Sequence, residues 1–440
     1  MSILTNPVFL SVVVLCVLCL LKLNVLMSLL IAALVGAAAG GIPLVAYQSS
    51  PALSLLCGGF SNNAQTALAY ILLGTFATAI ASTGLADMMS KKLTKIIGKK
   101  AQIMLLILAG VACFSQNLVP VHIAFIPIMI PPMLSLMNEL KIDRRAAACS
   151  LAFGLKAPYI AIPFGFGSIF MGIIADNMTA YGMPVTTSDV ARYNWILAVA
   201  MLIGLFIAIF ISYRKPREYK DAVVDTSASD AVSDRFTYAH GVTLVAIAIV
   251  VGVQVYSESL PLAALCGLLV MFVFRAIKWS EIDDQFMGGV KIMGMIAIIM
   301  LVAGGYAAVI NETGAVDELV EAAVAIMGGN KIIAATVITL IGLLVTMGIG
   351  SSFSTIPVVA VLYVPFCQKM GFSPAATILL MSAAAALGDA GSPASDTTLG
   401  PTSGLNADGQ HNHIWDTCVP TFLHFNIPLM IAAIVFSQFI

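Results

Sequence analysis

Charged residues are scarce in this chain. Lysine and arginine together number 21, aspartate and glutamate 22, and 60 % of the 440 residues are hydrophobic. So few charges cannot cover a soluble protein of this size, so the composition indicates an all-α polytopic membrane protein in a lipid bilayer. The net charge of -1 and the lack of a basic block of nucleic-acid-binding type exclude DNA or RNA as an expected partner.

The first apolar stretch lacks the basic residues that precede the core of a secretory signal. No lysine or arginine occurs within residues 1–21. We therefore interpret this stretch as the first membrane span.

Long apolar stretches define the predicted membrane topology, because about 20 apolar residues cross a bilayer as a helix. The sequence predicts ten spans, near residues 2–21, 25–47, 65–86, 146–175, 193–213, 240–256, 261–277, 291–311, 374–400 and 419–440. Two further stretches, 103–137 and 332–368, hold a polar cluster at the middle and charges at both ends. We interpret both as re-entrant hairpins that enter and leave on one side of the membrane.

The distribution of positive charge orients this arrangement. Of the 21 basic residues, 17 fall on one side, which the positive-inside rule makes cytoplasmic. We expect a bacterial plasma (inner) membrane protein with both termini outside. The hydrophilic segment 214–238 is a cytoplasmic, solvated linker between a first unit, residues 1–213, and a second, residues 239–440.

The two units resemble each other at a shift of 230 residues. Eight of 25 positions are identical in the stretches that begin at Gly74 and Gly304. Each unit holds five spans, and because five is odd, the second unit must be inverted relative to the first. The predicted fold is therefore two inverted-topology repeats of five spans, each with a re-entrant hairpin and a broken helix. This is the construction of secondary transporters, which bind substrate near the midplane.

Glycines and a proline interrupt the span 374–400 and bring hydroxyls and carboxylates to membrane depth. The candidate ligands for an ion or substrate are Asp389, Ser392, Ser395, Asp396 and Thr397. Oxygen ligands of this kind suit a hard cation such as Na+, or a transferable proton. A possible Na+ site comprises Asp389, Ser392, Ser395 and Asp396, and no other metal is expected. Alternatively, the two acids are loop residues near the cytoplasmic surface.

The broken span of the first unit, 146–175, carries Lys156 and no acid. Its ammonium is a candidate to occupy the place of a bound cation at the symmetry-related site. The alternative is a structural lysine, snorkelling or paired with one of the aspartates.

Both hairpins have polar tips at which helix amides are expected to be free. The candidate binding residues are Ser115, Gln116, Asn117, Ser351, Ser352 and Thr355. Opposed helix N-termini attract an anionic group such as a substrate carboxylate, although such tips can also merely satisfy their own backbone. His122 is a possible proton relay or a packed, hydrogen-bonded histidine. His411 and His413, in a predicted cytoplasmic loop, are weak evidence for a metal.

The segment GDAGSPASDTT at 388–398 resembles the motif of NhaC-type Na+/H+ antiporters in the ion transporter (ArsB/NhaD) superfamily. Within it the chain is similar to the YuiF-like branch, whose members are associated with amino-acid and particularly histidine transport. The resemblance implies that Asp389, Ser392, Ser395, Asp396 and Thr397 bind ion or substrate. It also implies a homodimer and an elevator-like motion. The first repeat departs from the motif at Lys156.

Together these features predict an ion-coupled secondary active transporter, not an enzyme, that works by alternating access. The expected partners are an amino acid, with histidine as the single candidate, and Na+ or H+ as coupling ion, with no cofactor. The alternative is an antiporter that exchanges Na+ and H+ themselves. A channel fits paired broken helices less well, and the spans show no nucleophile–base pair that an intramembrane enzyme would need.

Overall fold

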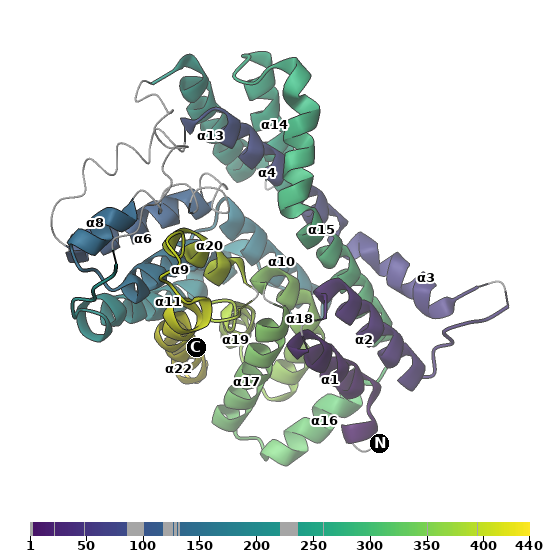
Figure 1. The fold of residues 1–440 in the computed structure, drawn as a ribbon. Coiled ribbons are helices and arrows are strands. Elements are labelled where there is room, and N and C mark those ends of the chain that lie inside the picture. The colour runs from purple at the N-terminus through teal and green to yellow at the C-terminus, as the bar shows by residue number, and fades with distance from the viewer. Residues whose placement is uncertain are drawn as a thin grey trace.

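The computed structural model describes residues 3–21, 23–47, 49–85, 101–117, 126, 130, 133–220, 236–257, 259–349, 351–393 and 395–440 (Figure 1). Over these residues the chain forms helices and no strand, apart from an isolated bridge between Ala46 and Ser49. The prediction of an all-helical protein is confirmed.

One group of helices, which we call the scaffold, combines the first helices of both halves. Its elements are α1 (Pro7–Leu20), α2 (Val25–Ala39), α3 (Pro51–Gly58), the 3-10 helix η2 (Gly59–Asn63), α4 (Ala64–Ser82), α13 (Tyr238–Ser257), α14 (Leu260–Val273) and α15 (Ile282–Glu312). The 31-residue α15 packs along α2, α3, η2 and α4, and α14 packs on α13 and α4 (Figure 1). The short α3 was not predicted as part of any span.

A second group, the core bundle, holds the remaining long helices. From the first half come α6 (Ala101–Asn117), α8 (Leu134–Glu139), α9 (Arg144–Ala161), α10 (Phe166–Ala180), α11 (Thr187–Ile207) and the π-helix η4 (Ala208–Ser212). From the second half come α17 (Lys331–Ile349), α18 (Ser352–Lys369), α19 (Pro374–Ala386), α20 (Asp396–Leu405), η6 (His413–Cys418), α21 (Val419–Thr421), η7 (Phe422–Asn426) and α22 (Ile427–Phe436). Helices α15 and α1 of the scaffold contact α18 and α17.

Most helices are shorter than the predicted spans. Within the described part of the chain, two helical stretches, Thr187–Ser212 and His413–Phe436, are long and apolar enough to cross a membrane by themselves. Two bent pairs would each add a span: Arg144–Ala161 with Phe166–Ala180, bent by 51°, and Ala297–Glu312 with Val316–Ile326, bent by 79°. Hydropathy runs through caps and turns that end the helices, so the count of ten spans stays a prediction.

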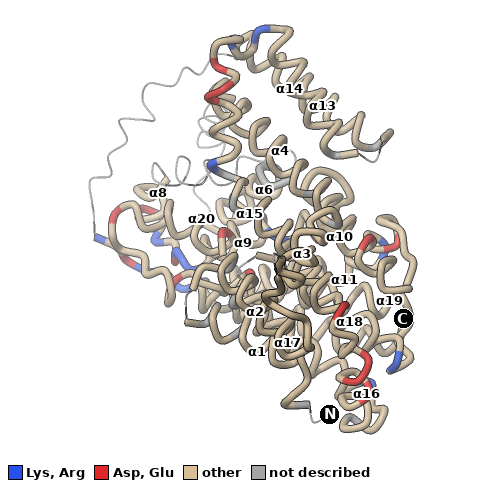
Figure 2. Tube along the Cα trace, turned by 90° about the vertical axis from the view of Figure 1, so that its right-hand side faces the viewer, with Lys and Arg blue, Asp and Glu red and all other residues tan. Residues whose placement is uncertain are grey.

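The helix α16 (Val316–Met327) carries much of the charge of its region. Figure 2 shows charged residues mainly toward the periphery, among them those of α16 and of the turn between α14 and α15, whereas most of the helical interior is uncharged. An amphipathic arm was also predicted in the first half at 85–97, but nearly all of that segment lies outside the described residues.

Both predicted broken spans are interrupted in the structure. Helix α9 ends at Ala161 and α10 begins at Phe166, while α19 ends at Ala386 and α20 begins at Asp396. Gly165, Gly388 and Gly391 adopt positive φ angles of 62°, 79° and 133° in these breaks, a conformation that residues with a side chain rarely tolerate. The glycines therefore determine where the helices stop.

Helix boundaries recur at the shift found in the sequence. Helices α6 and α17 start at residues 101 and 331, α9 and α19 at 144 and 374, and α10 and α20 at 166 and 396. Each pair of starts is 230 residues apart, which is the shift between the similar stretches in the two halves.

Glycines let α4 and α15 approach until their backbones touch. A Cβ atom on Gly74 would lie 2.7 Å from the carbonyl oxygen of Gly289, and one on Gly304 would lie 2.7 Å from that of Gly59. Neither position can hold a larger residue unless the two helices separate.

We expect Gly289→Ala to destabilise the protein by about 1–3 kcal/mol, because the added methyl group would overpack the contact with α4. Its Cβ would lie 2.3 Å from the backbone nitrogen of Thr75. Gly252→Ala on α13 is the matched control, since no atom lies within 4 Å of its added Cβ. Thermal unfolding of the purified variants measures the difference, and equal stability of the two would contradict the close approach.

Candidate functional site

A buried carboxylate lies in the break between α19 and α20. The Asp389 residue is 6 % exposed, and its Oδ2 atom accepts hydrogen bonds from Ser352 Oγ at 2.9 Å, Tyr159 Oη at 3.0 Å and Thr397 Oγ1 at 3.3 Å. Its Oδ1 atom accepts a hydrogen bond from the hydroxyl of Ser395. These five residues, which we call the Asp389 site, come from α9, α18, the 387–395 break and the start of α20.

Two helix N-termini face this carboxylate. Ser352 is the first residue of α18, and Ser395 is the N-cap of α20, with Thr397 in its first turn. The partial positive charge of a helix N-terminus stabilises a nearby anion. Among the described residues, no lysine or arginine forms an ion pair with Asp389, so hydroxyls and helix ends supply the compensation.

The Lys156 side chain lies fully buried on α9, close to the same break. Its ammonium donates a hydrogen bond to the carbonyl oxygen of Ala386, the last residue of α19. A helix C-terminus carries partial negative charge, which favours a cation there. Lys156 is therefore neither snorkelling nor ion-paired with an aspartate in this structure, contrary to the alternative interpretation of the sequence.

Tyr159 belongs to the site and was missed in the sequence analysis. Its hydroxyl lies 2.9 Å from Ser352 Oγ as well as 3.0 Å from Asp389 Oδ2. A signal for it existed, because Tyr159 and Asp389 are 230 residues apart and so occupy equivalent positions in the two halves.

An aromatic cluster borders the Asp389 site next to Ser352. The ring of Phe353 lies with its centroid 5.1 Å from that of Tyr159, 5.8 Å from Phe170, 5.9 Å from Tyr70 and 6.1 Å from Phe166. These rings come from α18, α9, α10 and the scaffold helix α4. They form an apolar wall beside a charged centre.

Not all predicted motif residues gather at Asp389. Ser395 and Thr397 do, whereas Ser392 Oγ donates a hydrogen bond to the carbonyl oxygen of Met347 at 3.1 Å, near the end of α17. The first residue of α20, Asp396, is exposed. The four predicted Na+ ligands therefore do not converge on one point in this structure, because the start of α20 directs neighbouring residues to different sides.

The second predicted hairpin tip is divided between binding and capping contacts. Ser352 reaches Asp389, but Ser351 is the N-cap of α18 and its hydroxyl accepts a hydrogen bond from the Ser354 amide. The hydroxyl of Thr355 donates to the carbonyl oxygen of Ser351 at 2.8 Å. For Ser351 and Thr355 the structure therefore agrees with the alternative that the tip satisfies its own backbone.

The first predicted tip differs from expectation. Ser115, Gln116 and Asn117 are the last three residues of α6, so the polar cluster ends a helix and does not start one. A cluster of polar residues in an apolar stretch does not reveal on which side of it a helix stops. The predicted relay residue His122 lies outside the described residues.

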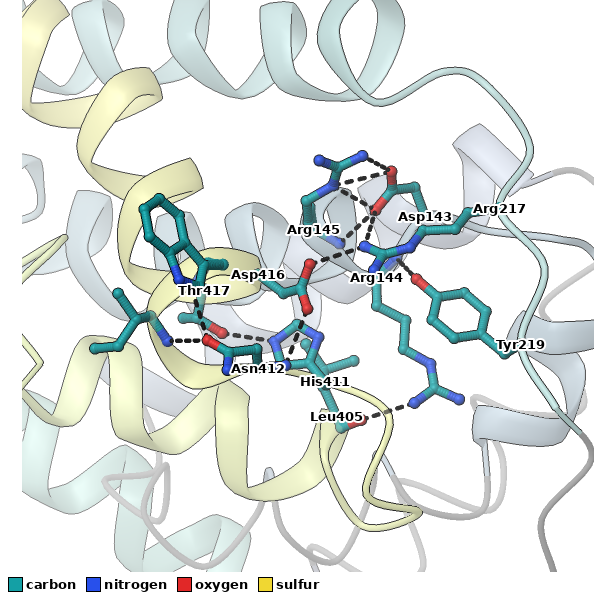
Figure 3. A network of polar contacts seen from close by, with 12 residues as sticks. Asp143, Arg144, Arg145, Arg217, Tyr219, Leu405, His411, Asn412, Asp416 and Thr417 are labelled. Carbon is teal, nitrogen blue, oxygen red and sulfur yellow. Dashed lines mark hydrogen bonds and ion pairs between the residues drawn. The ribbon is translucent and has the colours of Figure 1, made fainter.

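A second polar cluster joins α9 to the loop after α20 (Figure 3). Arg144 and Asp408 form an ion pair at 2.6 Å, with side chains 0 % and 1 % exposed. The Arg144 guanidinium also donates to the carbonyl oxygen of Leu405 and the side chain of Asn138, each at 3.0 Å. This pair fixes the end of α20 to the start of α9.

The start of the predicted linker is docked on this cluster and is not simply solvated. Arg217 forms an ion pair with Asp416 at 2.8 Å, and the hydroxyl of Tyr219 accepts a hydrogen bond from the backbone amide of Arg144 at 3.0 Å (Figure 3). Residues 221–235 of the linker lie outside the described part. The prediction of a solvated segment is thus wrong for its first residues.

The histidines of this loop serve hydrogen bonding. Burial lowers the pKa of His411 to about 4, so it is neutral at pH 7, and its Nε2 lies 2.7 Å from the hydroxyl of Thr417. The ring of His413 contacts the hydroxyl of Thr402 and the carbonyl oxygen of Pro393. The described residues contain no group of three or more histidine, cysteine or acidic side chains that could hold a metal ion.

We expect Asp408→Ala to destabilise the protein by about 3–5 kcal/mol, because it leaves the Arg144 guanidinium buried without its counter-charge. The control is Glu218→Ala, which breaks an exposed pair with Lys141 and should cost less than about 1 kcal/mol. Thermal unfolding in detergent measures both. Similar losses for the two variants would contradict the role of the buried pair.

Two family comparisons give the class of protein. A family described as the Na+/H+ antiporter family matches residues 150–437, and one described as the Na+-H+ antiporter family matches residues 6–97. The all-helical fold, the broken helices and these matches define a membrane transporter. The chain belongs to the Na+/H+ antiporter family.

Individual relatives agree with this assignment. The chain is 48 % identical to YuiF of Bacillus subtilis, named provisionally as an amino acid transporter, over 85 % of this chain and 87 % of YuiF. It is 46 % identical to the uncharacterized membrane protein VP2115 of Vibrio parahaemolyticus, over 97 % of this chain and 98 % of that protein.

Solved transporters share the fold at low identity. The YdaH transporter of Alcanivorax borkumensis matches with a TM-score of 0.64 and 13 % identity, over 88 % of this chain and 87 % of that one. MtrF of Neisseria gonorrhoeae, from a class described as antimetabolite efflux pumps, matches with a TM-score of 0.59 and 15 % identity, over 88 % and 83 %.

Proposed function

We propose that this protein is a secondary active transporter that couples Na+ or H+ to the movement of an amino acid, with L-histidine as the single best candidate. The observation that carries the proposal is the buried Asp389 carboxylate, held by hydroxyls from three helical segments at the helix breaks. A carboxylate in this setting can bind either cation. The provisional name of the relative YuiF supports the amino acid.

Contacts between equivalent residues support two inverted repeats around this site. Lys156 contacts Ala386 and Tyr159 contacts Asp389, and each pair is 230 residues apart. Copies related by a two-fold axis bring equivalent residues together only at the axis. The Asp389 site would therefore lie on the axis between the repeats, where inverted-repeat transporters bind substrate near the midplane.

The scaffold contacts obey the same relation. Gly59 touches Gly304 and Gly74 touches Gly289. Adding 230 to 59 gives 289 and adding 230 to 74 gives 304, so the two contacts are exchanged by the repeat. An isologous two-fold contact has this reciprocity, which supports an axis that also passes between α4 and α15.

The chemistry of the site suits a cation and a zwitterion together. A hydroxyl both donates and accepts, so the four that now donate to Asp389 can turn their oxygens toward a bound Na+. The N-terminus of α18 provides amides for a substrate carboxylate. An antiporter that exchanges only cations would need the carboxylate alone, and this remains the second candidate function because the family is described as Na+/H+ antiporters.

The remaining parts of the proposal concern the membrane. We propose a bacterial plasma membrane location with both termini outside and residues 214–238 inside, supported by the 17 of 21 basic residues on one side of the predicted topology. A homodimer with elevator-like motion is proposed on the family resemblance.

Uptake by the purified protein in proteoliposomes tests the function directly. Labelled L-histidine is supplied first and the other amino acids after it, with inward Na+ and proton gradients imposed separately. Gradient-driven uptake of an amino acid supports the proposal. Exchange of Na+ for H+ without any amino acid uptake favours the antiporter instead.

We expect Asp389→Asn to reduce gradient-driven uptake at least about 100-fold, because it removes the charge that binds the coupling cation but keeps the size of the side chain. Asp396→Asn is the matched control from the same motif, since its side chain is exposed, and it should retain more activity. Uptake at equal amounts of reconstituted protein measures both. Full coupling in Asp389→Asn would rule out this residue as the coupling site.

We expect Lys156→Ala to make transport newly dependent on Na+ or to raise the Na+ concentration needed, because a free cation must then replace the ammonium at the end of α19. Lys156→Arg should also be impaired, since its planar group does not fit the place of a compact ammonium. Uptake is measured against Na+ concentration, with Lys141→Ala as the exposed-lysine control. An unchanged Na+ dependence in well-folded Lys156→Ala would contradict the surrogate-cation role.

A further inference from the structure

The scaffold helix α4 carries a buried tyrosine whose hydroxyl has no partner among the described residues. Tyr70 is 1 % exposed, and its Oη atom makes no hydrogen bond to any of them. Leaving a buried hydroxyl unpaired costs roughly 1–3 kcal/mol relative to leaving it in water. Such a group in a native structure requires a reason, and a ligand that completes the hydrogen bond is one.

Tyr70 stands beside the wall of the Asp389 site. Its ring meets that of Phe353 edge-on, at 88° and 5.9 Å between centroids, and lies 6.4 Å from that of Phe166. Phe353 directly follows Ser352, which donates a hydrogen bond to Asp389. The unpaired hydroxyl thus belongs to the aromatic residue that the scaffold supplies to this cluster.

A second scaffold tyrosine shows that an unpaired hydroxyl is not a general property of these helices. Tyr306 on α15 is also 1 % exposed, and its hydroxyl accepts a hydrogen bond from Ser11 at 3.1 Å. Two tyrosines in similar apolar surroundings therefore differ in one respect. The tyrosine near the Asp389 site lacks a partner within the described part of the chain, and the tyrosine away from it has one.

We propose that Tyr70 is a substrate-binding residue whose hydroxyl forms a hydrogen bond with a polar group of the transported amino acid. The inference rests on the proposed transport function. The substrate lies between core bundle and scaffold, with its polar group against the Phe353 wall. Substrate binding then satisfies a hydroxyl that stays unpaired in the empty protein, which adds to affinity without stabilising the empty state.

Tyr70→Phe separates this role from a structural one. The substitution keeps the ring and its contacts with Phe353 and Phe166 and removes only the hydroxyl. Removing an unpaired buried hydroxyl does not destabilise a fold, whereas removing a paired one does. Stability and transport should therefore respond in opposite ways.

The experiment compares wild type, Tyr70→Phe and the control Tyr306→Phe in detergent and in proteoliposomes. The probe is labelled L-histidine, or the amino acid that the wild type takes up fastest. Tyr70→Phe should unfold, without substrate, at the same temperature as wild type or higher. Its KM should rise about 10-fold with the maximal rate within about 2-fold, as for loss of one binding hydrogen bond. Tyr306→Phe should unfold roughly 2 °C lower with an unchanged KM.

Two results would overturn the assignment of Tyr70. An unchanged KM in Tyr70→Phe means that the substrate does not contact the hydroxyl, as when bound water alone pairs with it. A fall in unfolding temperature equal to that of Tyr306→Phe means that the hydroxyl has a partner within the protein. Failure of the proposed function is distinct, because it shows as a wild-type protein that takes up no amino acid.

Discussion

The arrangement of the core bundle depends on a single buried carboxylate that has no ion-pair partner among the described residues. A charge taken out of water must be compensated by hydrogen bonds or by other charges. Asp389 receives four hydroxyl hydrogen bonds, from α9, α18, the Ser395 cap and the first turn of α20. A continuous helix could not supply them, because its N-terminal ends would not face the carboxylate. The breaks in the helices and the charge therefore require each other.

The packing around the break follows from small residues. The last turn of α19 is the run of alanines from Ala383 to Ala386, all fully buried, and Gly388 takes a positive φ directly after it. A Cβ atom on Gly388 would lie 2.6 Å from the backbone nitrogen of Met347 on α17. The same residues that interrupt α19 thus allow the neighbouring hairpin helix to approach. Close backbone approach in turn holds the start of α18 near Asp389.

The sequence was informative where function and local geometry share the same residues. Asp389, Ser395 and Thr397 could be predicted because an acid beside glycines and a proline inside an apolar run is costly unless a broken helix and a bound ligand compensate it. Tyr159 and Tyr70 could not, since an aromatic residue in an apolar helix is most often core, and their role depends on contacts across more than two hundred residues. Asp396 shows the opposite error, because a motif gives composition but not the side of a helix on which a side chain lies.

The Asp389 hydroxyls provide a physical route from ion binding to conformational change under the proposed function. Each hydroxyl that donates to the carboxylate also connects an element to it: Tyr159 connects α9 and Ser352 connects α18. A cation or proton on Asp389 takes over lone pairs that these hydroxyls now use, so the connections weaken together. The occupied and empty states then differ in how firmly three elements are joined. Because a ligand shifts an equilibrium only by its differential affinity for the two states, this shared carboxylate is where coupling would arise.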